Sequence, residues 1–134
     1  MLANIPLLII PFILYNLGLA GLVGDGTADP WAIQLFSVSM MSGGVWSMTL
    51  ADALVVLALV LLFVEMVKST RTSNASVVDH LLSTFVFVAF LVEFLLVDGA
   101  AHSLFFVLMV IALFDVLAGF SVSIRSAGRD ITMS

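Results

Sequence analysis

The chain has 134 residues, of which 63% are hydrophobic and 10% are charged, and its mean hydropathy is +1.29. A water-soluble domain usually carries about 25% charged residues, so this composition excludes a soluble globular protein and indicates an integral membrane protein. The net charge of −5 comes with only four basic residues and no basic patch, so we expect no nucleic-acid partner. The chain has no cysteine, which excludes disulfides, thiolate metal sites and cysteine nucleophiles.

The first apolar run covers residues 5–23 and is predicted to be a transmembrane helix. No Lys or Arg precedes it, so it lacks the basic start of a secretory signal peptide. Pro11 removes a backbone donor inside the run, which predicts a kink in the turn before it. The second half carries Asn16, Gly18 and Gly21, small or polar residues that let helices approach closely in lipid, and we expect them to form a packing surface.

A turn and a helix start follow the first run. Asp29 suits an N-cap and Pro30 suits the first helical position, so a short helix is predicted over residues 30–41. This segment is too short to span a bilayer, and Trp, which prefers the headgroup level, stands near each of its ends. The segment is predicted to be interfacial or re-entrant. Alternatively, it forms the tilted first half of a long second helix that is hinged at Gly43 and Gly44.

Three further apolar runs are each about 20 residues long, which matches a hydrocarbon core of about 30 Å. They predict transmembrane helices over residues 47–67, 78–97 and 103–124. The last two are joined so closely that they must be antiparallel neighbours. The predicted fold is therefore an all-α integral membrane protein, a single domain over residues 1–134. It has four transmembrane helices in two antiparallel hairpins, with a short interfacial or re-entrant helix between the first two.

The basic residues predict the orientation of the chain. Lys68 and Arg71 lie between the second and third helices, and Arg125 and Arg129 lie in the tail. By the positive-inside rule, this connection and both termini face the cytoplasm. We expect the protein in the cytoplasmic membrane of a bacterium.

Asp115 is the most informative polar residue, because a charge at the centre of a membrane helix costs about 2.5–3.5 kcal/mol on insertion scales. It shares a helix face with Ala112, Gly119 and Ser123, at spacings of three, four and eight residues. Because these residues are small or polar, the face is predicted to pack against protein and not against lipid.

The remaining ionisable residues are predicted to lie in two layers. Asp52 and Glu93 come to one level near the outer ends of their helices, while Glu65, His80 and Asp115 form a looser inner layer. One interpretation is that the layers carry protons or cations across the bilayer. The other is that the acids near helix ends reach the headgroup region and that Asp115 hydrogen-bonds a neighbouring helix.

Two histidines suggest haem ligation, since neutral imidazole is a common axial ligand. His80 and His102 lie at opposite ends of a predicted helix, roughly 30 Å apart, so they cannot share a haem within one chain. A polar residue at a helix end is the simpler account. No phosphate loop, metal-ligand pair or Ser/His/Asp constellation is recognisable, so we expect no enzyme activity, no metal and no cofactor.

Two functions are compatible with these features. The first is a structural or accessory subunit that packs in the bilayer against itself or against a larger membrane complex. The alternative is a homo-oligomeric channel or proton-coupled transporter that uses Asp115 and Glu93. Small multidrug resistance transporters carry an essential glutamate in their first helix, whereas the first predicted helix of this chain, residues 5–23, has no acid.

Overall fold

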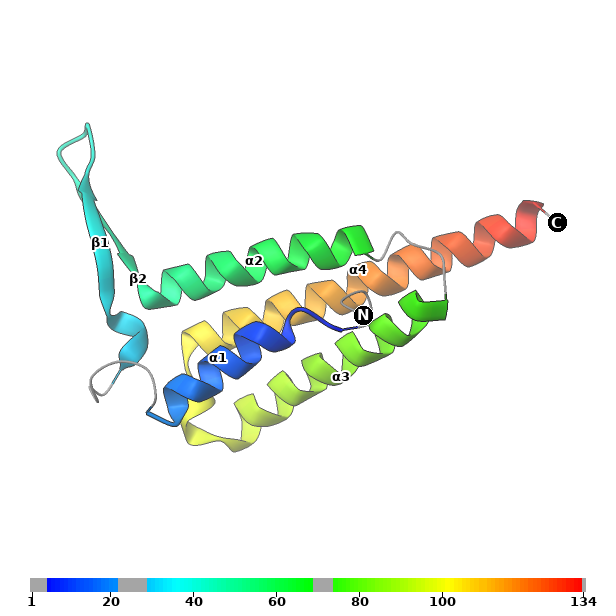
Figure 1. Cartoon of the computed structure of the whole chain (residues 1–134), viewed down its shortest axis with the longest axis horizontal. Coiled ribbons are helices and arrows are strands. Elements are labelled where there is room, and N and C mark those ends of the chain that lie inside the picture. Colours follow the sequence, from blue (N-terminus) through cyan, green and yellow to red (C-terminus); the bar gives the residue numbers. More distant parts are fainter. Residues whose placement is uncertain (1–4, 22–28, 69–73, 134) are drawn as a thin grey trace.

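The structure is a computed structural model that describes residues 5–21, 29–68 and 74–133. Within these ranges, the side chains of residues 74–77 and 122–133 are not described. It is mostly helical and contains one two-stranded sheet (Figure 1). The elements in chain order are α1 (Ile9–Leu19), η2 (Pro30–Ala32), β1 (Gln34–Ser39), β2 (Val45–Thr49), α2 (Leu50–Lys68), α3 (Asn74–Leu96), η3 (Asp98–Ala100) and α4 (Ser103–Met133).

Three helices in the described part of the chain are long and apolar enough to cross a membrane. The apolar segments are Leu50–Lys68, Val78–Leu96 and Ser103–Ser121, each of 19 residues, or about 28 Å of helix. They agree with the second, third and fourth predicted spans. The fourth predicted span ends at residue 124, and α4 continues beyond it to Met133.

Helix α1 is shorter than the span predicted over residues 5–23. It has 11 residues, which corresponds to about 16 Å. It begins at Ile9, so Pro11 falls in the first turn, where backbone N–H groups have no intrahelical acceptor. The helix therefore begins where a kink was predicted. Gly21 follows its C-cap with a φ of 81°, a conformation that favours glycine and ends the helix.

The prediction of a helix over residues 30–41 is wrong. Asp29 does cap a helical turn, accepting a hydrogen bond from the Trp31 backbone N–H at 3.1 Å, but this turn ends at Ala32. Strands β1 and β2 then pair antiparallel. Apolar and serine residues alternate from residue 36 to residue 40, and this period of two is typical of a strand. The all-α fold class is corrected accordingly.

A tight turn at Gly43 and Gly44 joins the two strands. Gly43 has a φ of 92°, which favours glycine, and the Met40 backbone N–H donates to the Gly44 carbonyl oxygen at 2.7 Å. The glycine pair is therefore a hairpin turn and not a hinge within a helix. A capping box fixes the start of α2, because Thr49 N–H donates to Asp52 Oδ2 at 3.1 Å and Asp52 N–H donates to Thr49 Oγ1 at 3.2 Å.

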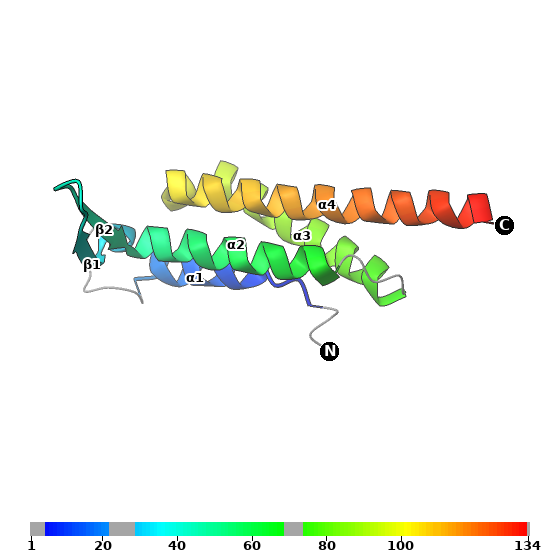
Figure 2. The same ribbon diagram turned by 90° about the horizontal axis from the view of Figure 1, so that it is seen from above.

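The bundle has two distinct ends. The β-hairpin, the end of α1 and η3 lie at one end, called here the hairpin end (Figure 1). The end of α2 and the start of α3 lie at the other, called the Lys68 end, where the last turns of α4 extend beyond the other helices (Figures 1 and 2). Helix α4 packs against α3, as predicted, and also against α2, while α1 contacts α2 and α4.

Aromatic side chains form the core near the hairpin end. Tyr15 stacks on Trp31 with ring centroids 5.2 Å apart, and its hydroxyl donates to the Gly99 carbonyl oxygen at 2.9 Å. The ring of Phe105 lies 4.8 Å from that of Tyr15 and 5.2 Å from that of Phe90. These contacts hold α1, η2, η3, α3 and α4 together.

Gly18 allows α1 to approach Trp31. A Cβ at this position would contact the Trp31 ring, which is held by its stacking on Tyr15. We expect Gly18→Ala to lower the free energy of unfolding by about 1–3 kcal/mol, the usual cost of overpacking. Unfolding in mixed detergent micelles, followed by tryptophan fluorescence, measures this change. Gly44→Ala is the control, because its Cβ would make only an ordinary 3.5 Å contact with Ser42. Equal effects of the two substitutions would contradict the prediction.

Candidate functional site

A buried polar cluster lies at the Lys68 end of the bundle. We call it the Lys68 cluster, and it consists of Glu65 and Lys68 from α2, Asp79 and Ser83 from α3, and Asp115 from α4. The three acids and the serine are each 6% exposed or less. Buried charges are costly unless they are paired, so the contacts of this cluster determine what it can do.

Lys68 is the basic residue that pairs with these acids. Its Nζ lies 3.1 Å from Glu65 Oε1 and 3.5 Å from Asp79 Oδ1, and it donates to the Ile5 carbonyl oxygen at 2.8 Å. Glu65 and Lys68 are three residues apart on α2 and therefore share a face. The long lysine side chain reaches from the end of α2 both to α3 and to the segment before α1.

Glu65 has a second partner from the start of the chain. Its Oε1 accepts a hydrogen bond from the Leu7 backbone N–H at 2.6 Å. Leu7 precedes α1, where backbone N–H groups lack intrahelical acceptors. The carboxylate therefore satisfies a backbone donor as well as the lysine. Both contacts fix the N-terminal segment against α2.

Asp115 faces the interior of the bundle, as its small-residue helix face predicted. The Ser83 hydroxyl donates a hydrogen bond to its carboxylate, and the charges of Glu65 and Lys68 act on it. His80 lies near the same level, with its ring so close to Gly119 that a Cβ there would come within 2.5 Å of Nδ1. The predicted inner layer is therefore assembled around α3, α4 and the end of α2.

The two acids of the predicted outer layer have different partners. Asp52 is exposed and caps its own helix with Thr49. Glu93 is half-buried and accepts a hydrogen bond from the Asn16 side chain, while its Oε2 is buried without a hydrogen-bond partner among the described residues. Asn16 also donates to the Phe12 carbonyl oxygen at 2.8 Å. Glu93 thus faces α1 and not the start of α2.

An apolar layer separates Glu93 from the Lys68 cluster. Asp79 and Glu93 are 14 residues apart on α3, which corresponds to about 21 Å. Phe90 lies between them and is 1% exposed, with the ring of Phe12 at 4.9 Å and that of Phe105 at 5.2 Å. The three phenylalanine side chains are apolar and therefore provide no polar link between Glu93 and the Lys68 cluster.

The residues predicted to pack helices together make most of their contacts within one copy of the chain. Gly18 and Gly119 contact aromatic or imidazole rings of the same chain, and Ala112 is in the core at 2% exposure. Gly21 is exposed at the end of α1, and the side chain of Ser123 lies outside the described residues. Close contacts at these small residues therefore join helices of one copy.

Lys68 and Ser83 belong to the Lys68 cluster but were not predicted from the sequence to be part of a site. Lys68 was interpreted only as an orientation signal in a polar connection. Its spacing of three residues from Glu65 is the signal that could have identified the pair. Ser83 gave no comparable signal, because a lone serine in a transmembrane helix commonly bonds to the backbone of its own helix.

The two histidines lie at opposite ends of the bundle and do not share a site. His102 Nε2 lies 3.5 Å from Asp29 Oδ2 at the exposed hairpin end. His80 lies in the first part of α3, toward the Lys68 end. Among the described residues, no group of three or more His, Asp or Glu side chains is arranged to hold a metal ion. Comparison of the chain with protein-family models, curated proteins and solved structures finds no match.

The pairing of Lys68 can be tested by removing its charge. We expect Lys68→Met to lower the free energy of unfolding by about 3–5 kcal/mol, because Glu65 and Asp79 lose their buried partner. The double variant Lys68→Met/Glu65→Gln should recover part of the loss, since the glutamine oxygen is uncharged and still accepts from Leu7. Unfolding in mixed micelles measures both effects. Asp98→Asn, at an exposed position, is the control for charge removal and should be near neutral. A Lys68→Met variant as stable as Asp98→Asn would contradict the pairing.

Proposed function

We propose that this protein is a structural or accessory subunit that packs in the bilayer against copies of itself or against a larger membrane complex. The observation that carries the proposal is that each acid of the Lys68 cluster has a partner within the chain. A conducting carboxylate must exchange its proton or ion with both sides of the membrane. Here Glu65 and Asp79 have Lys68 as their partner and Asp115 has Ser83, so these groups serve to join helices.

The apolar layer around Phe90 supports the same role. It separates the Lys68 cluster from Glu93 by several turns of helix, so protons have no continuous chain of described polar side chains along α3. Proton relays in membrane proteins use successive acidic or imidazole groups.

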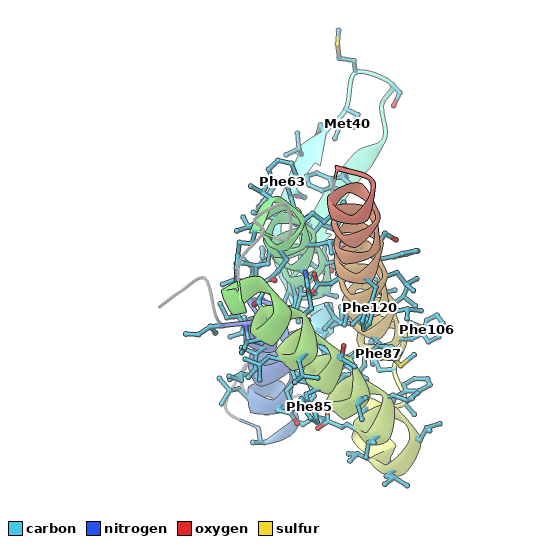
Figure 3. The ribbon with its side chains drawn as sticks, turned by 90° about the vertical axis from the view of Figure 1, so that its right-hand side faces the viewer. Met40, Phe63, Phe85, Phe87, Phe106 and Phe120 are labelled. Atoms are coloured by element: carbon cyan, nitrogen blue, oxygen red, sulfur yellow. The ribbon has the colours of Figure 1, made fainter. Side chains whose placement is uncertain are left out.

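The outer surface of the helices offers a large area for lipid or protein neighbours. Only 17% of the residues in the α2 span are buried within the chain, against 39% for α4. Large side chains lie on the outside of the bundle, among them Phe63, Phe85, Phe106 and Phe120 (Figure 3). An exposed apolar helix face is suited to lipid, to a second copy or to a larger membrane subunit.

The orientation proposed for the protein places the Lys68 end in the cytoplasm of a bacterium. Lys68 ends α2, Arg125 and Arg129 lie in the last turns of α4, and Arg71 follows Lys68 in the sequence, whereas residues 29–49 and 97–102 contain no Lys or Arg. In this arrangement α1 is a short fourth membrane segment, both termini are cytoplasmic, and the β-hairpin is on the outer side. The proposal includes no catalytic activity, no cofactor and no nucleic-acid partner.

Native mass spectrometry of the protein, extracted gently from its own membrane, tests the proposed role. We expect a complex of constant composition, either a homo-oligomer or an assembly with larger membrane subunits. The same measurement after extraction in a harsher detergent provides the control for loss of subunits. Isolation as a monomer with lipid alone under the mildest extraction would contradict the proposal.

A proton-coupled transporter or homo-oligomeric channel is the second candidate. One observation favours it, namely the buried Glu93 Oε2 with no hydrogen-bond partner among the described residues. A carboxyl oxygen of this kind is available to a proton or to a transported cation. Asp115 would then be the corresponding group toward the Lys68 end.

Proton flux into liposomes loaded with a pH-sensitive dye distinguishes the two candidates. For a structural subunit, we expect the wild-type protein and the Glu93→Gln and Asp115→Asn variants to give the same flux as protein-free liposomes. For a transporter, the wild-type protein should conduct, and each variant should lose conduction while it remains folded and assembled. Asp98→Asn is the matched control, because this acid is exposed near η3. Wild-type flux that depends on Glu93 would overturn the structural assignment.

A further inference from the structure

The β-hairpin is amphipathic. Residues that are directly opposite in the ladder share a face, and the register pairs Phe36 with Met48 and Val38 with Trp46. Together with Met40 these residues form one face, called here the apolar face. The rings of Phe36 and Trp46 contact each other on it, with centroids 5.6 Å apart. Phe36, Val38, Met40 and Trp46 are each between 43% and 48% exposed, and Met48 is half-buried, so much of this face is left uncovered by the described chain.

The opposite face is mostly serine. Ser37 pairs with Ser47, and Ser39 pairs with Val45. Residues 30–49 contain no charged side chain at all. Proteins protect exposed sheet edges from water-borne partners with charges, especially Lys, or with proline. This hairpin has neither within its strands, so it is built for a surrounding other than bulk water.

The position of the hairpin is set by its junction with α2. The Leu50 backbone N–H, at the start of that helix, donates to the Ile33 carbonyl oxygen at 2.8 Å. Together with the capping box at Thr49, this bond anchors both strands at the point where an apolar span of 19 residues begins. The hairpin stands crosswise to the helices (Figure 1), and Met40 lies away from the bundle (Figure 3).

From these features we infer that the hairpin lies flat in the headgroup layer of the bilayer. Its apolar face is in contact with the upper acyl chains, and its serine face is in contact with water. A helix that spans the bilayer brings a crosswise segment at its end into the plane of the membrane surface. Trp46 suits this level, because its ring is amphipathic.

Lipid accounts for the hairpin better than a protein partner does. An isolated two-stranded hairpin is only marginally stable in water, and lipid contact on one face supplies the missing apolar burial. A partner that adds a strand would bind the edge and would not require apolar and serine residues on opposite faces. Helix α2 follows β2 directly in the chain, so the hairpin is joined to an apolar span without a linker.

Two single-cysteine variants test the inference, since the native chain has no cysteine. Val38→Cys places a label on the apolar face, and Ser39→Cys places one on the serine face of the same strand. Each is labelled with the fluorophore NBD and reconstituted as one full-length chain per phosphatidylcholine nanodisc. We expect the label at position 38 to emit at shorter wavelength and to react several-fold more slowly with aqueous dithionite than the label at position 39. Lipids with a nitroxide near the headgroup should quench the label at position 38 more strongly than lipids with a nitroxide deep in the acyl chain.

Three results would overturn the inference. Equal dithionite rates for the two labels would show that neither face is covered. Stronger quenching by the deep nitroxide would show a re-entrant hairpin. Protection of position 38 only in liposomes crowded with protein, and not in single-chain nanodiscs, would show that a second copy covers the apolar face. A label at position 56, which is exposed on α2 within the apolar span, serves as the reference inside the bilayer.

Discussion

Ionisable side chains at membrane depth need partners within the protein, because the hydrocarbon core offers no water to solvate them. Lys68 meets this constraint for two carboxylates at once, Glu65 of its own helix and Asp79 of α3, and it also binds the Ile5 carbonyl oxygen. These groups come from three separate segments of the chain. Lys68 therefore joins the N-terminal segment, α2 and α3, and Asp115 on α4 accepts a hydrogen bond from Ser83 of α3.

Neutral groups join α1 to the other end of the bundle. There the Tyr15 hydroxyl bonds to the Gly99 carbonyl oxygen, and its ring stacks on Trp31. Helix α1, with 11 residues, is consequently anchored at both ends, by Leu7 at the Lys68 cluster and by Tyr15 at the hairpin end. Its polar contacts and small residues are used inside the chain, so the surface that remains for neighbours is almost entirely apolar. This division supports a protein whose polar groups hold it together and whose outer face meets lipid or other subunits.

Local signals in the sequence were interpreted correctly where one periodicity dominated, and incorrectly where two signals competed. The cap at Asp29 is present as predicted, but it starts a turn of only three residues. The alternation from Phe36 onward and the glycine turn at Gly43 then outweigh helix propensity, because a period of two places the apolar residues on one face of a strand. Lys68 was missed for a different reason. Its charge lies at the end of a long flexible side chain, so its position along the sequence does not show which helix it reaches.

The linear pattern of apolar residues was sufficient to predict three helices that are able to cross a bilayer, and approximately where each begins and ends. That result depends only on runs of about 20 apolar residues, a property of the linear chain. It also located every acid that lies in such a run. Which of these acids are paired follows from the packing of the helices, because α4 packs against both α2 and α3, and Glu93 faces α1 instead of Asp52. Such pairings depend on helix rotation and packing order, which residues distant in sequence establish together.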